Sequence, residues 1–467
     1  MLPRVLLVNP PQRRVYAGAV TPVGLPHSPV LSLATVAAGL IREGFSVRVF
    51  DFNQAENLEK KFRALVSGYR PDFVGVTFTT PLFSEAVGIA ALVKREAPDA
   101  VLIAGGPHLS ALPEETLRDS DFSLGVAGEG DFSLAEFLKD GGHKKAPGIV
   151  VKTGGEVSYA GPREMIPDLD DLPLPAWELF ELGSYRTSYL LARRNPTGWL
   201  ETSRGCVQNC SYCSKSVFGR RLRTKSPERV AAEMERMLAL GFREIHLADD
   251  NFCADPDRVL AICELIRKQG LDFPWAPVTG VRVDSLDREL LRTMQAAGCY
   301  RIYVGVESGN QDVLNRNQKG IRLEQVRAVV RYCRELGLET FGFFMLGLPG
   351  ETEENLRETI RFARSLDFDL VKATFTIPIP GSELFAELQK SGRLKGMNWP
   401  DYSYYRIPET IYDHSHLDWG TVRKYFGRFY RGFYLRPHYV WRRLASSLKR
   451  DAIFSDLKTL FQVKWWK

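Results

Sequence analysis

Short apolar runs alternate with amphipathic stretches over residues 1–150. The amphipathic stretch Leu31–Glu43 has apolar residues at helical spacing and ends at Gly44. The apolar runs have the length of strands, and they are Arg4–Asn9, Ser46–Phe50, Phe73–Phe78 and Ala100–Ala104. Strands separated by helices are typical of a doubly wound parallel sheet. We therefore expect residues 1–150 to form an α/β domain whose ligands bind where the strands end.

The alternation stops near residue 150 and resumes near residue 196. Residues 151–195 contain several prolines and no clear period, so we predict a linker there. Residues 196–385 contain six further apolar runs, namely Leu200–Ser203, Glu244–Leu247, Pro277–Val283, Arg301–Val306, Thr340–Met345 and Leu370–Thr376. Six strand–helix units suit a partial (β/α)6 barrel of the TIM type, with active-site residues at the strand ends.

The last stretch, residues 386–467, is predicted to be helical and basic. One helical face is apolar, and it carries Val422, Tyr425, Phe426, Phe429, Tyr430, Phe433 and Tyr434. Pro437 ends that helix, and further apolar segments carry Trp441, Trp465 and Trp466. Two interpretations stay open. The segment either lies on an anionic membrane as a basic amphipathic tail or packs on the barrel as a helical cap.

Composition restricts the class of protein, and the charge is unevenly distributed. Hydrophobic residues at 44% and charged residues at 25% are ordinary globular values, which argues against long disorder or several membrane spans. Residues 421–467 carry 12 Lys and Arg against Asp451 and Asp456, so the net charge of +6 is +10 in this tail and -4 elsewhere. No uncharged apolar stretch reaches the ~18 residues of a spanning helix. We expect a cytoplasmic protein.

The seven cysteines are also unevenly placed. None precedes Cys206, and three of them, Cys206, Cys210 and Cys213, form a C-x3-C-x2-C run just after a predicted strand. An odd count with one tight group suits a reducing compartment and a metal site. Cysteine thiolates at such spacings hold iron–sulfur clusters, and three ligands leave one iron of a four-iron cluster free. The alternatives are a zinc site completed by a distant residue, or chance.

The cysteine run, with the aromatic Tyr212 before its third member, resembles the signature of the radical S-adenosylmethionine superfamily. The resemblance extends over residues 197–385. It implies that Cys206, Cys210 and Cys213 ligate a 4Fe-4S cluster whose free iron binds S-adenosylmethionine. One-electron reduction then yields methionine and a 5'-deoxyadenosyl radical, so the resemblance also implies an external reductant of the flavodoxin or ferredoxin type.

The same resemblance implies contacts to S-adenosylmethionine at the ends of the barrel strands. They are Asp249, Asp250 and Asn251 for the methionine amino group, Glu307 and Ser308 for the ribose, and Gly347 and Gly350 for the adenine. A carboxylate is an apt partner for an ammonium group. Arg282 is either a contact to a carboxylate or substrate, or a structural ion pair.

Residues 1–150 resemble the Rossmann-like (flavodoxin-like) cobalamin-binding domain that precedes the barrel in one large subfamily. The implied cobalamin contacts are Asn9, Thr79, Thr80, Gly105, Gly106, His108, Gly128, Glu129 and Gly130. Glycines at strand ends let the backbone approach a bulky ligand closely. The motif D-x-H-x-x-G, whose histidine ligates cobalt in many such domains, does not occur here. His108 either approaches the corrin or has a turn or capping role.

Together these features resemble the cobalamin-dependent radical S-adenosylmethionine enzymes, similar to the hopanoid methylase and anaerobic protoporphyrin-ester cyclase group. The predicted reaction is C-methylation of an unactivated carbon in a small or lipid-like substrate. The alternative is oxidation, cyclisation or rearrangement without methyl transfer. The basic residues 421–467 suggest peripheral contact with the inner membrane surface.

Two other classes of protein fit the sequence less well. A methylthiotransferase acting on transfer RNA would account for a basic tail, but such enzymes carry a second cluster on N-terminal cysteines and residues 1–205 contain none. No nucleic-acid partner is therefore expected. A non-enzymatic corrinoid sensor would need only the first domain, and the cysteine run argues against it.

Overall fold

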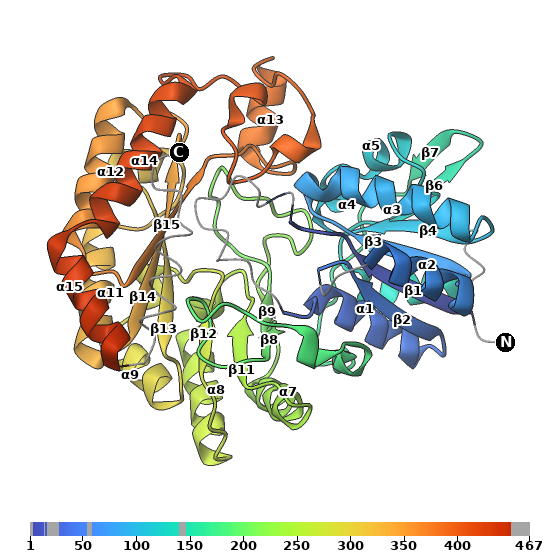
Figure 1. Ribbon diagram of the computed structural model, residues 1–467, viewed down its shortest axis with the longest axis horizontal. Helices are drawn as coiled ribbons and strands as arrows, with labels where there is room; N and C mark the ends of the chain where they lie inside the picture. Colours follow the sequence, from blue (N-terminus) through green and yellow to red (C-terminus); the bar gives the residue numbers. More distant parts are fainter. Residues whose placement is uncertain (1–2, 14, 16–27, 54–57, 140–145, 450–467) are drawn as a thin grey trace.

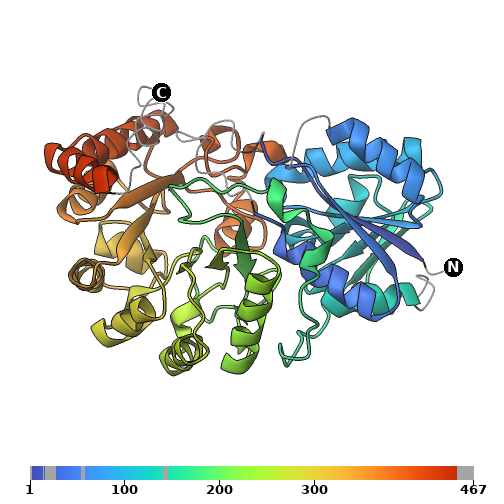
Figure 2. The ribbon, with the colours of Figure 1, turned by 60° about the horizontal axis from the view of Figure 1, so that its bottom comes forward.

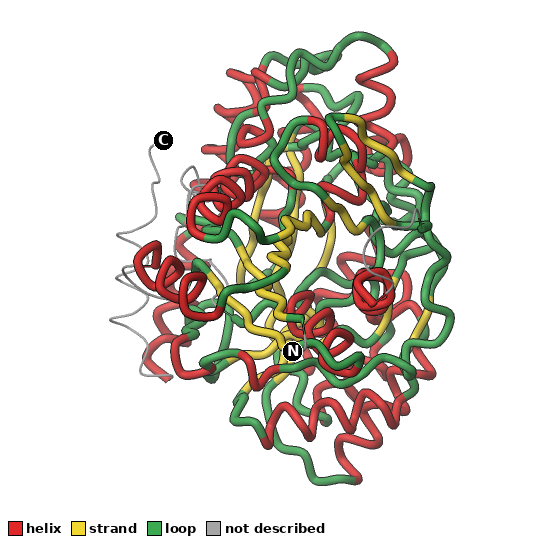
Figure 3. Tube along the Cα trace, turned by 90° about the vertical axis from the view of Figure 1, so that its right-hand side faces the viewer, coloured by secondary structure: helices red, strands yellow, loops and turns green. Residues whose placement is uncertain are grey.

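The computed structural model describes residues 3–13, 15, 28–53, 58–139 and 146–449. Two lobes lie side by side, an N-terminal α/β domain and a larger barrel (Figure 1). Figure 2 shows the same two lobes after a turn about the horizontal axis. In Figure 3 the strands of the chain run through its interior and helices lie outside them.

The N-terminal sheet has the strand order β2-β1-β3-β4-β5-β6-β7. Its first five strands are parallel, with bounds β1 Arg4–Asn9, β2 Ser46–Asp51, β3 Phe73–Thr77, β4 Val101–Gly105 and β5 Leu124–Val126. The order 2-1-3-4-5 is that of flavodoxin-like folds, which confirms the doubly wound sheet predicted for this region. The antiparallel strands β6 (Ile149–Thr153) and β7 (Glu156–Tyr159) extend the sheet past the predicted boundary at residue 150.

Helices cover both faces of this sheet. Their bounds are α1 Leu31–Arg42, α2 Leu58–Tyr69, α3 Phe83–Glu96, α4 Pro107–Ala111, α5 Pro113–Arg118 and α6 Gly130–Lys139. Helix α1 approaches the start of α6 very closely, because a Cβ at Gly39 would lie 1.9 Å from the carbonyl oxygen of Asp131. Only glycine fits at this contact between the third turn of α1 and the first turn of α6.

The barrel consists of two three-stranded parallel sheets. One holds β8 (Thr197–Leu200), β11 (Glu244–Leu247) and β12 (Trp275–Pro277), and the other holds β13 (Arg301–Glu307), β14 (Glu339–Leu346) and β15 (Leu370–Phe375). Isolated bridges from Trp275 to Cys299 and from Val281 to Val304 join the two sheets. The first and third strands begin earlier than the apolar runs Leu200–Ser203 and Pro277–Val283 predicted, and these runs continue into strand-end loops.

Helices surround the barrel strands on the outside. Their bounds are α7 Pro227–Ala239, α8 Pro256–Lys268, α9 Arg288–Ala296, α10 Gln311–Arg316, α11 Leu323–Leu336 and α12 Glu353–Ser365. The short strands β9 (Ser203–Arg204) and β10 (Arg223–Thr224) form a separate antiparallel pair. This pair encloses the loop of residues 205–222, which carries the three clustered cysteines.

The C-terminal helices are α13 (Glu383–Lys390), α14 (Trp419–Tyr434) and α15 (Pro437–Lys449). The aromatic face of α14 packs against the barrel, where Phe426 stacks on Phe375 with ring centroids 4.4 Å apart. The Tyr430 hydroxyl accepts from the backbone N–H of Ala373 and donates to its carbonyl, both at 3.0 Å, and Tyr434 bonds Val371 in the same way. Helix α14 therefore caps the free edge of β15, as the second interpretation predicted for its aromatic face, whereas Trp465 and Trp466 lie outside the described residues.

The C-terminal region also touches the N-terminal domain. The ring of Trp399 lies 4.9 Å from the ring of His108, and the Ser403 hydroxyl donates to the carbonyl of Val15 at 2.8 Å. The two lobes are thus joined by the C-terminal segment as well as by the linker. No helix in the described ranges is both long and apolar enough to cross a membrane.

Candidate cofactor sites at the domain boundary

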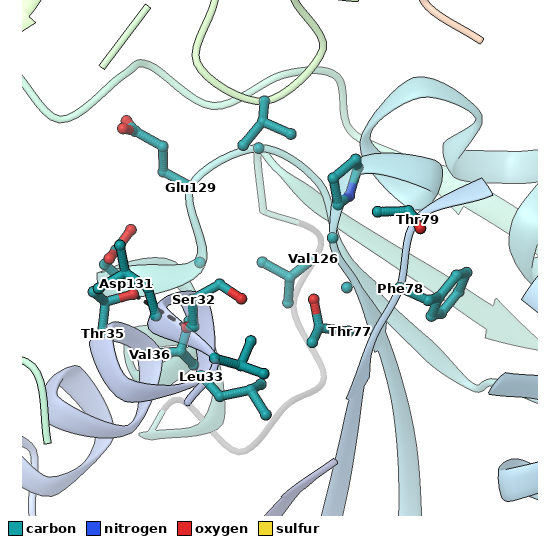
Figure 4. A pocket seen from close by; sticks show the side chains of 18 of the residues that line it. Ser32, Leu33, Thr35, Val36, Thr77, Phe78, Thr79, Val126, Glu129 and Asp131 are labelled. Atoms are coloured by element: carbon teal, nitrogen blue, oxygen red, sulfur yellow. Dashed lines mark hydrogen bonds between the residues drawn. The ribbon is translucent and has the colours of Figure 1, made fainter. Parts of the chain in front are cut away.

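A cavity of about 550 Å³ lies at the carboxyl edge of the N-terminal sheet and is lined by both lobes (Figure 4). Its inner wall is apolar, with Leu7, Ile103 and Leu134 among the lining residues. Its rim includes residues 214–219 of the cysteine loop. Ligands of open α/β sheets bind at this edge, so the cavity is the candidate cobalamin site.

Two glycines shape this cavity in different ways. Gly106 has φ +95°, and a Cβ there would lie 2.8 Å from the carbonyl oxygen of Phe78, so no side chain fits. Gly128 has φ +81°, and a Cβ there would meet nothing within 4 Å. The wall at Gly128 is therefore bare backbone facing free space, which fits the close approach of a large planar ligand.

Most of the predicted cobalamin residues lie around this cavity. Its lining includes Asn9, Thr79, Gly105, Gly106, Gly128, Glu129 and Gly130. Figure 4 shows Ser32, Thr35 and Val36 of α1 around the same hollow; they belong to the segment Pro29–Gly39, which resembles the cobalamin-binding domain, but were not singled out as contacts. Asn9 donates to the carboxylate of Asp51 at 2.8 Å, so its side chain is held in place by the sheet. The contacts of these residues with cobalamin stay predictions.

His108 and Thr80 lie apart from the other predicted cobalamin residues. The His108 side chain is buried, its Nδ1 lies 3.2 Å from the Thr80 hydroxyl, and its ring packs among Phe78, Phe83 and Trp399. Burial lowers the pKa of His108 to about 4, so the ring is neutral at neutral pH. Neither residue lines the cavity, and we assign His108 to core packing in place of the corrin contact considered from the sequence.

The cysteine loop leaves the barrel directly after β9. Gly205 starts it with φ +82°, and a Cβ there would lie 2.3 Å from the carbonyl oxygen of Arg221. The barrel holds the middle of the loop, because Ser211 donates to the Asn317 carbonyl at 3.2 Å and accepts from Leu384 N–H at 2.9 Å. Cys206 is buried, Cys210 is half-buried and Cys213 is exposed.

The donor set of this loop suits a cluster better than a single ion. Within the described part of the chain, no three His, Cys, Asp or Glu side chains converge on one point that a metal ion could occupy. A cubane cluster binds each thiolate to a different iron, so its cysteines do not need to converge. Lys215 lies within the loop, with its Nζ 3.5 Å from Cys213 Sγ. Residues 205–222 therefore fit a four-iron cluster with three protein ligands.

The other four cysteines lie in the barrel core. Burial raises the pKa of Cys263 and of Cys333 to about 12, and it raises the pKa of Cys253 and Cys299 as well. Their thiols stay protonated at neutral pH and are poor metal ligands. The loop cysteines therefore stay the predicted cluster ligands.

The segment Asp249–Asn251 follows β11, as predicted, but its three residues differ in surroundings. Asp249 is fully buried and accepts from Thr202 N–H at 2.7 Å, from the Thr202 hydroxyl at 2.5 Å and from the Ser203 hydroxyl at 2.6 Å. The carboxylate is used within the protein, so we assign Asp249 a bracing role in place of the predicted contact to the methionine amino group.

Asp250 and Asn251 keep acceptor atoms for a ligand. Asp250 is exposed, lines the cavity and accepts from Gly205 N–H at 3.1 Å. Asn251 is 4% exposed, and its Oδ1 has no partner among the described residues. A buried acceptor without a donor is costly, which fits the ammonium group of S-adenosylmethionine as the missing donor.

The predicted ribose segment is at the end of β13. Glu307 has φ +66° and accepts from Lys319 Nζ at 2.9 Å. Ser308 is fully buried, with its hydroxyl 3.2 Å from the Thr359 hydroxyl. Arg282 donates to Asp284 and to the carbonyls of 319 and 320. Contact between Glu307 and the ribose stays a proposal. Of the two alternatives for Arg282, the structure favours the structural ion pair, which Arg282 forms with Asp284.

The predicted adenine loop is closed by a buried carboxyl group. Glu351 accepts from Gly347 N–H at 2.7 Å and Leu348 N–H at 3.2 Å through one oxygen, and its other oxygen has no partner among the described residues. Burial raises the pKa of Glu351 to about 8.

Gly347 and Gly350 are required by packing, because Cβ atoms there would strike Trp419 and Arg316. The Tyr212 ring packs beside this loop against Leu348 and Met345.

The structure adds residues that the sequence did not single out. Arg204, beside the first cysteine, and Arg223 both bond Glu129 across the domain boundary, and Asp131 also binds Arg204. A charged residue next to a cysteine run is a weak signal by itself. Its partners lie about 75 positions away in the chain, so only the tertiary structure reveals them.

An α/β domain with a cavity at its strand ends, joined to a six-stranded partial barrel with a three-cysteine loop, defines a two-cofactor enzyme class. Two family models match the corresponding regions, the B12 binding domain at residues 19–138 and the Radical SAM superfamily at residues 200–363. The chain is 31% identical over 442 residues to an uncharacterized methyltransferase of Pyrococcus horikoshii, covering 93% of both chains. The chain therefore belongs to the B12-binding radical SAM enzymes.

Further relatives and a solved structure agree with this assignment. The chain is 27% identical to cytidylyl-2-hydroxyethylphosphonate methyltransferase of Streptomyces wedmorensis, covering 86% of this chain and 84% of the relative. It is also 27% identical to the anaerobic magnesium-protoporphyrin IX monomethyl ester cyclase of Cereibacter sphaeroides, covering 91% and 69%. The cobalamin-dependent S-adenosylmethionine radical enzyme OxsB shares the fold, with a TM-score of 0.74, 19% identity and coverage of 96% and 71%.

These findings confirm the resemblance to the cobalamin-dependent radical S-adenosylmethionine enzymes. The protein is a radical SAM enzyme, and its cofactors are a 4Fe-4S cluster, S-adenosylmethionine and cobalamin. The residues that hold each cofactor stay predictions, supported by the geometry described above.

Proposed function

We propose that the protein is a cobalamin-dependent C-methyltransferase that acts on an unactivated carbon of a small or lipid-like substrate. The observation that carries this proposal is the shared cavity, whose lining combines the strand ends of the N-terminal domain with residues 214–219 of the cysteine loop. The candidate cobalamin site and the candidate cluster site are therefore neighbours. The names of the Pyrococcus and Streptomyces relatives also favour methyl transfer.

When bound, the cluster and S-adenosylmethionine supply a radical that removes hydrogen from carbon, and cobalamin supplies a methyl group. In this proposal Cys206, Cys210 and Cys213 hold the cluster. Asn251 accepts from the ammonium group of S-adenosylmethionine, and Glu307 accepts from its ribose. The bare wall at Gly128 and the hydroxyl groups of α1 hold the corrin edge, and the apolar interior excludes water.

The test is anaerobic reconstitution with iron, sulfide and hydroxocobalamin, followed by metal analysis and turnover of S-adenosylmethionine with candidate substrates. Methyl transfer to carbon consumes two molecules of S-adenosylmethionine, one as methyl donor and one as radical source. It therefore yields S-adenosylhomocysteine and 5'-deoxyadenosine in equal amounts, with methyl-labelled product. Substrate-dependent 5'-deoxyadenosine without S-adenosylhomocysteine would refute methyl transfer.

That last result would support the second candidate, a cobalamin-dependent oxidation, cyclisation or rearrangement. The relative named as a protoporphyrin ester cyclase favours this candidate. Both reactions need an external one-electron reductant, which we propose to be of the flavodoxin or ferredoxin type. The same assay, run with flavodoxin and reductase in place of dithionite, tests that partner.

Peripheral membrane contact stays part of the proposal, but its surface is α15 and not the buried face of α14. Trp441 is 76% exposed and Val440 and Leu444 are also exposed, with Arg443 between them in the sequence. Exposed tryptophan beside basic residues suits an anionic lipid surface. We expect Trp441→Ser to reduce co-sedimentation with vesicles containing phosphatidylglycerol, and unchanged co-sedimentation would refute the contact.

A further inference from the structure

The loop that carries the cysteines is closed at its base by two arginines. Strands β9 and β10 pair antiparallel, and Arg204 lies directly opposite Arg223 in that pairing. The residues between them, 205–222, include the three cluster cysteines. Any group that binds both arginines therefore holds both ends of the loop at once.

Two carboxylates of the N-terminal domain bind the two arginines at the ends of this loop. Asp131 binds Arg204 in a bidentate manner, at 2.9 and 3.0 Å, and Glu129 binds Arg204 at 2.9 Å. Glu129 also accepts from Arg223 through both oxygens, at 2.9 and 2.8 Å. Bidentate contacts fix direction as well as distance, so the two lobes have little freedom to slide here.

The contacts are removed from solvent. The side chains of Arg204, Arg223, Glu129 and Asp131 are each 3–5% exposed. Arg204 also donates to Glu201 at 2.5 Å and lies over the ring of Phe218 at 5.0 Å. Burial alone would raise the pKa of Asp131, but the charge and hydrogen bonds of Arg204 outweigh it and lower that pKa. The group is therefore a charged network between the lobes.

Each end of this network is part of a candidate cofactor site. Glu129 and Asp131 line the cobalamin cavity, together with Arg204 and Phe218. Arg204 precedes Cys206 by two residues. The Arg204 side chain therefore links the carboxylates of the cavity wall to the backbone that leads into the first cluster cysteine.

Resting on the proposed function, we propose that Arg204 is a positioning residue that locks the cluster loop to the wall of the cobalamin cavity and sets the spacing between the two cofactors. A fixed spacing matters because a radical formed beside one cofactor must react beside the other, and small misplacements cost rate. A buried ion network is weak evidence for net stability, and its best attested use is to specify one arrangement among several.

The test uses Arg204→Lys, which keeps the charge and removes the bidentate contact with Asp131. The matched control is Arg301→Lys, because Arg301 is equally buried and binds Glu339 through two nitrogens at 2.9 and 2.6 Å within the barrel. Each protein is reconstituted with cluster and cobalamin, and its iron and cobalt contents are measured. Pulsed electron paramagnetic resonance then reports the spin–spin interaction between the reduced cluster and cob(II)alamin.

We expect Arg204→Lys to retain iron and cobalt but to show a broader distribution of this interaction, while Arg301→Lys matches the wild type. Hydrogen exchange on the proteins without cofactors gives a second readout. We expect faster exchange at residues 126–133 and 201–206 in Arg204→Lys alone.

Three other results would overturn these statements in distinguishable ways. An unchanged spin–spin distribution with unchanged exchange in fully loaded Arg204→Lys would overturn the role of Arg204 and leave the proposed function standing. The same broadening in Arg301→Lys would show a general loss of rigidity and also overturn that role. A wild-type protein that holds the cluster but no cobalt would overturn the proposed function. It would also overturn the proposal that Arg204 sets the spacing between two cofactors.

Discussion

Replacing Asp249 by Asn separates a bracing role from direct contact with S-adenosylmethionine. The carboxylate accepts three hydrogen bonds from Thr202 and Ser203, just before the cysteine loop. In Asp249→Asn one oxygen remains for Thr202 N–H, and an amide nitrogen takes the place of the other oxygen. Both hydroxyl groups then face a donor.

The magnitude of the effect follows from the distances. The two hydroxyl oxygens lie 2.5 and 2.6 Å from the carboxylate oxygen, which suits O–H donation to a charged acceptor. An N–H donor prefers about 2.9 Å, so the amide can use the hydroxyls as acceptors only if the site expands. Hydrogen bonds to charged groups contribute about 1.5–3 kcal/mol each. With partial compensation, we expect a loss of about 2–4 kcal/mol in the free energy of unfolding.

The assay combines urea denaturation of the cofactor-free protein with hydrogen exchange at residues 201–206. Asp250→Asn is the matched control, because Asp250 is exposed and accepts one backbone N–H, and we expect it to cost less than about 1 kcal/mol. Among Asp249→Asn molecules that retain the cluster, the Kd for S-adenosylmethionine should stay near the wild-type value. Asn251→Ala should raise that Kd about tenfold, as loss of one charge-assisted hydrogen bond does.

The opposite pattern would refute this reasoning. If Asp249→Asn is as stable as the wild type but binds S-adenosylmethionine at least tenfold more weakly, the Asp249 carboxylate contacts the ligand. The assignment of Asp249 to a bracing role is then wrong.

Four further outcomes are expected. Cys210→Ala should lose most of the reconstituted iron while Cys333→Ala, in the core, keeps it, and equal iron contents would contradict the assignment of the loop. For Glu351, whose pKa is about 8 in the folded state against 4.5 ordinarily, the bound proton stabilises the fold at low pH, and this contribution is lost as the pH rises through 8. The stability of the wild type relative to Glu351→Gln should therefore fall between pH 5 and 8, and a flat difference would rule out a buried neutral carboxyl. Tyr430→Phe leaves the N–H and C=O of an edge strand unpaired and should cost about 2–4 kcal/mol, measured by denaturation. Because no histidine of the described chain lines the cavity, bound cob(II)alamin should show no nitrogen hyperfine splitting from a protein imidazole, and splitting that disappears in His108→Ala would reverse the packing assignment.

Much of the architecture was predictable from local pattern. The parallel strands of the first domain and the barrel units repeat apolar runs between amphipathic helices, and burial of these runs is a property of each segment. The three loop cysteines could be proposed as cluster ligands for the same reason, since they lie within eight residues of one another. The hairpin β6–β7 was missed because its strands are only five and four residues long and a Gly154–Gly155 turn joins them at the start of a proline-containing stretch.

Roles that depend on distant partners were decided only by the tertiary structure. Glu129 and Asp249 are both acidic residues in strand-end loops, yet one joins two arginines across the lobes and the other braces a neighbouring strand end. The aromatic face of α14 was equally compatible with lipid or protein until the free edge of β15 supplied its partner. A sequence shows which side chains can hydrogen-bond or bury apolar area, but the long-range packing determines which groups satisfy them and which acceptors remain free for a cofactor.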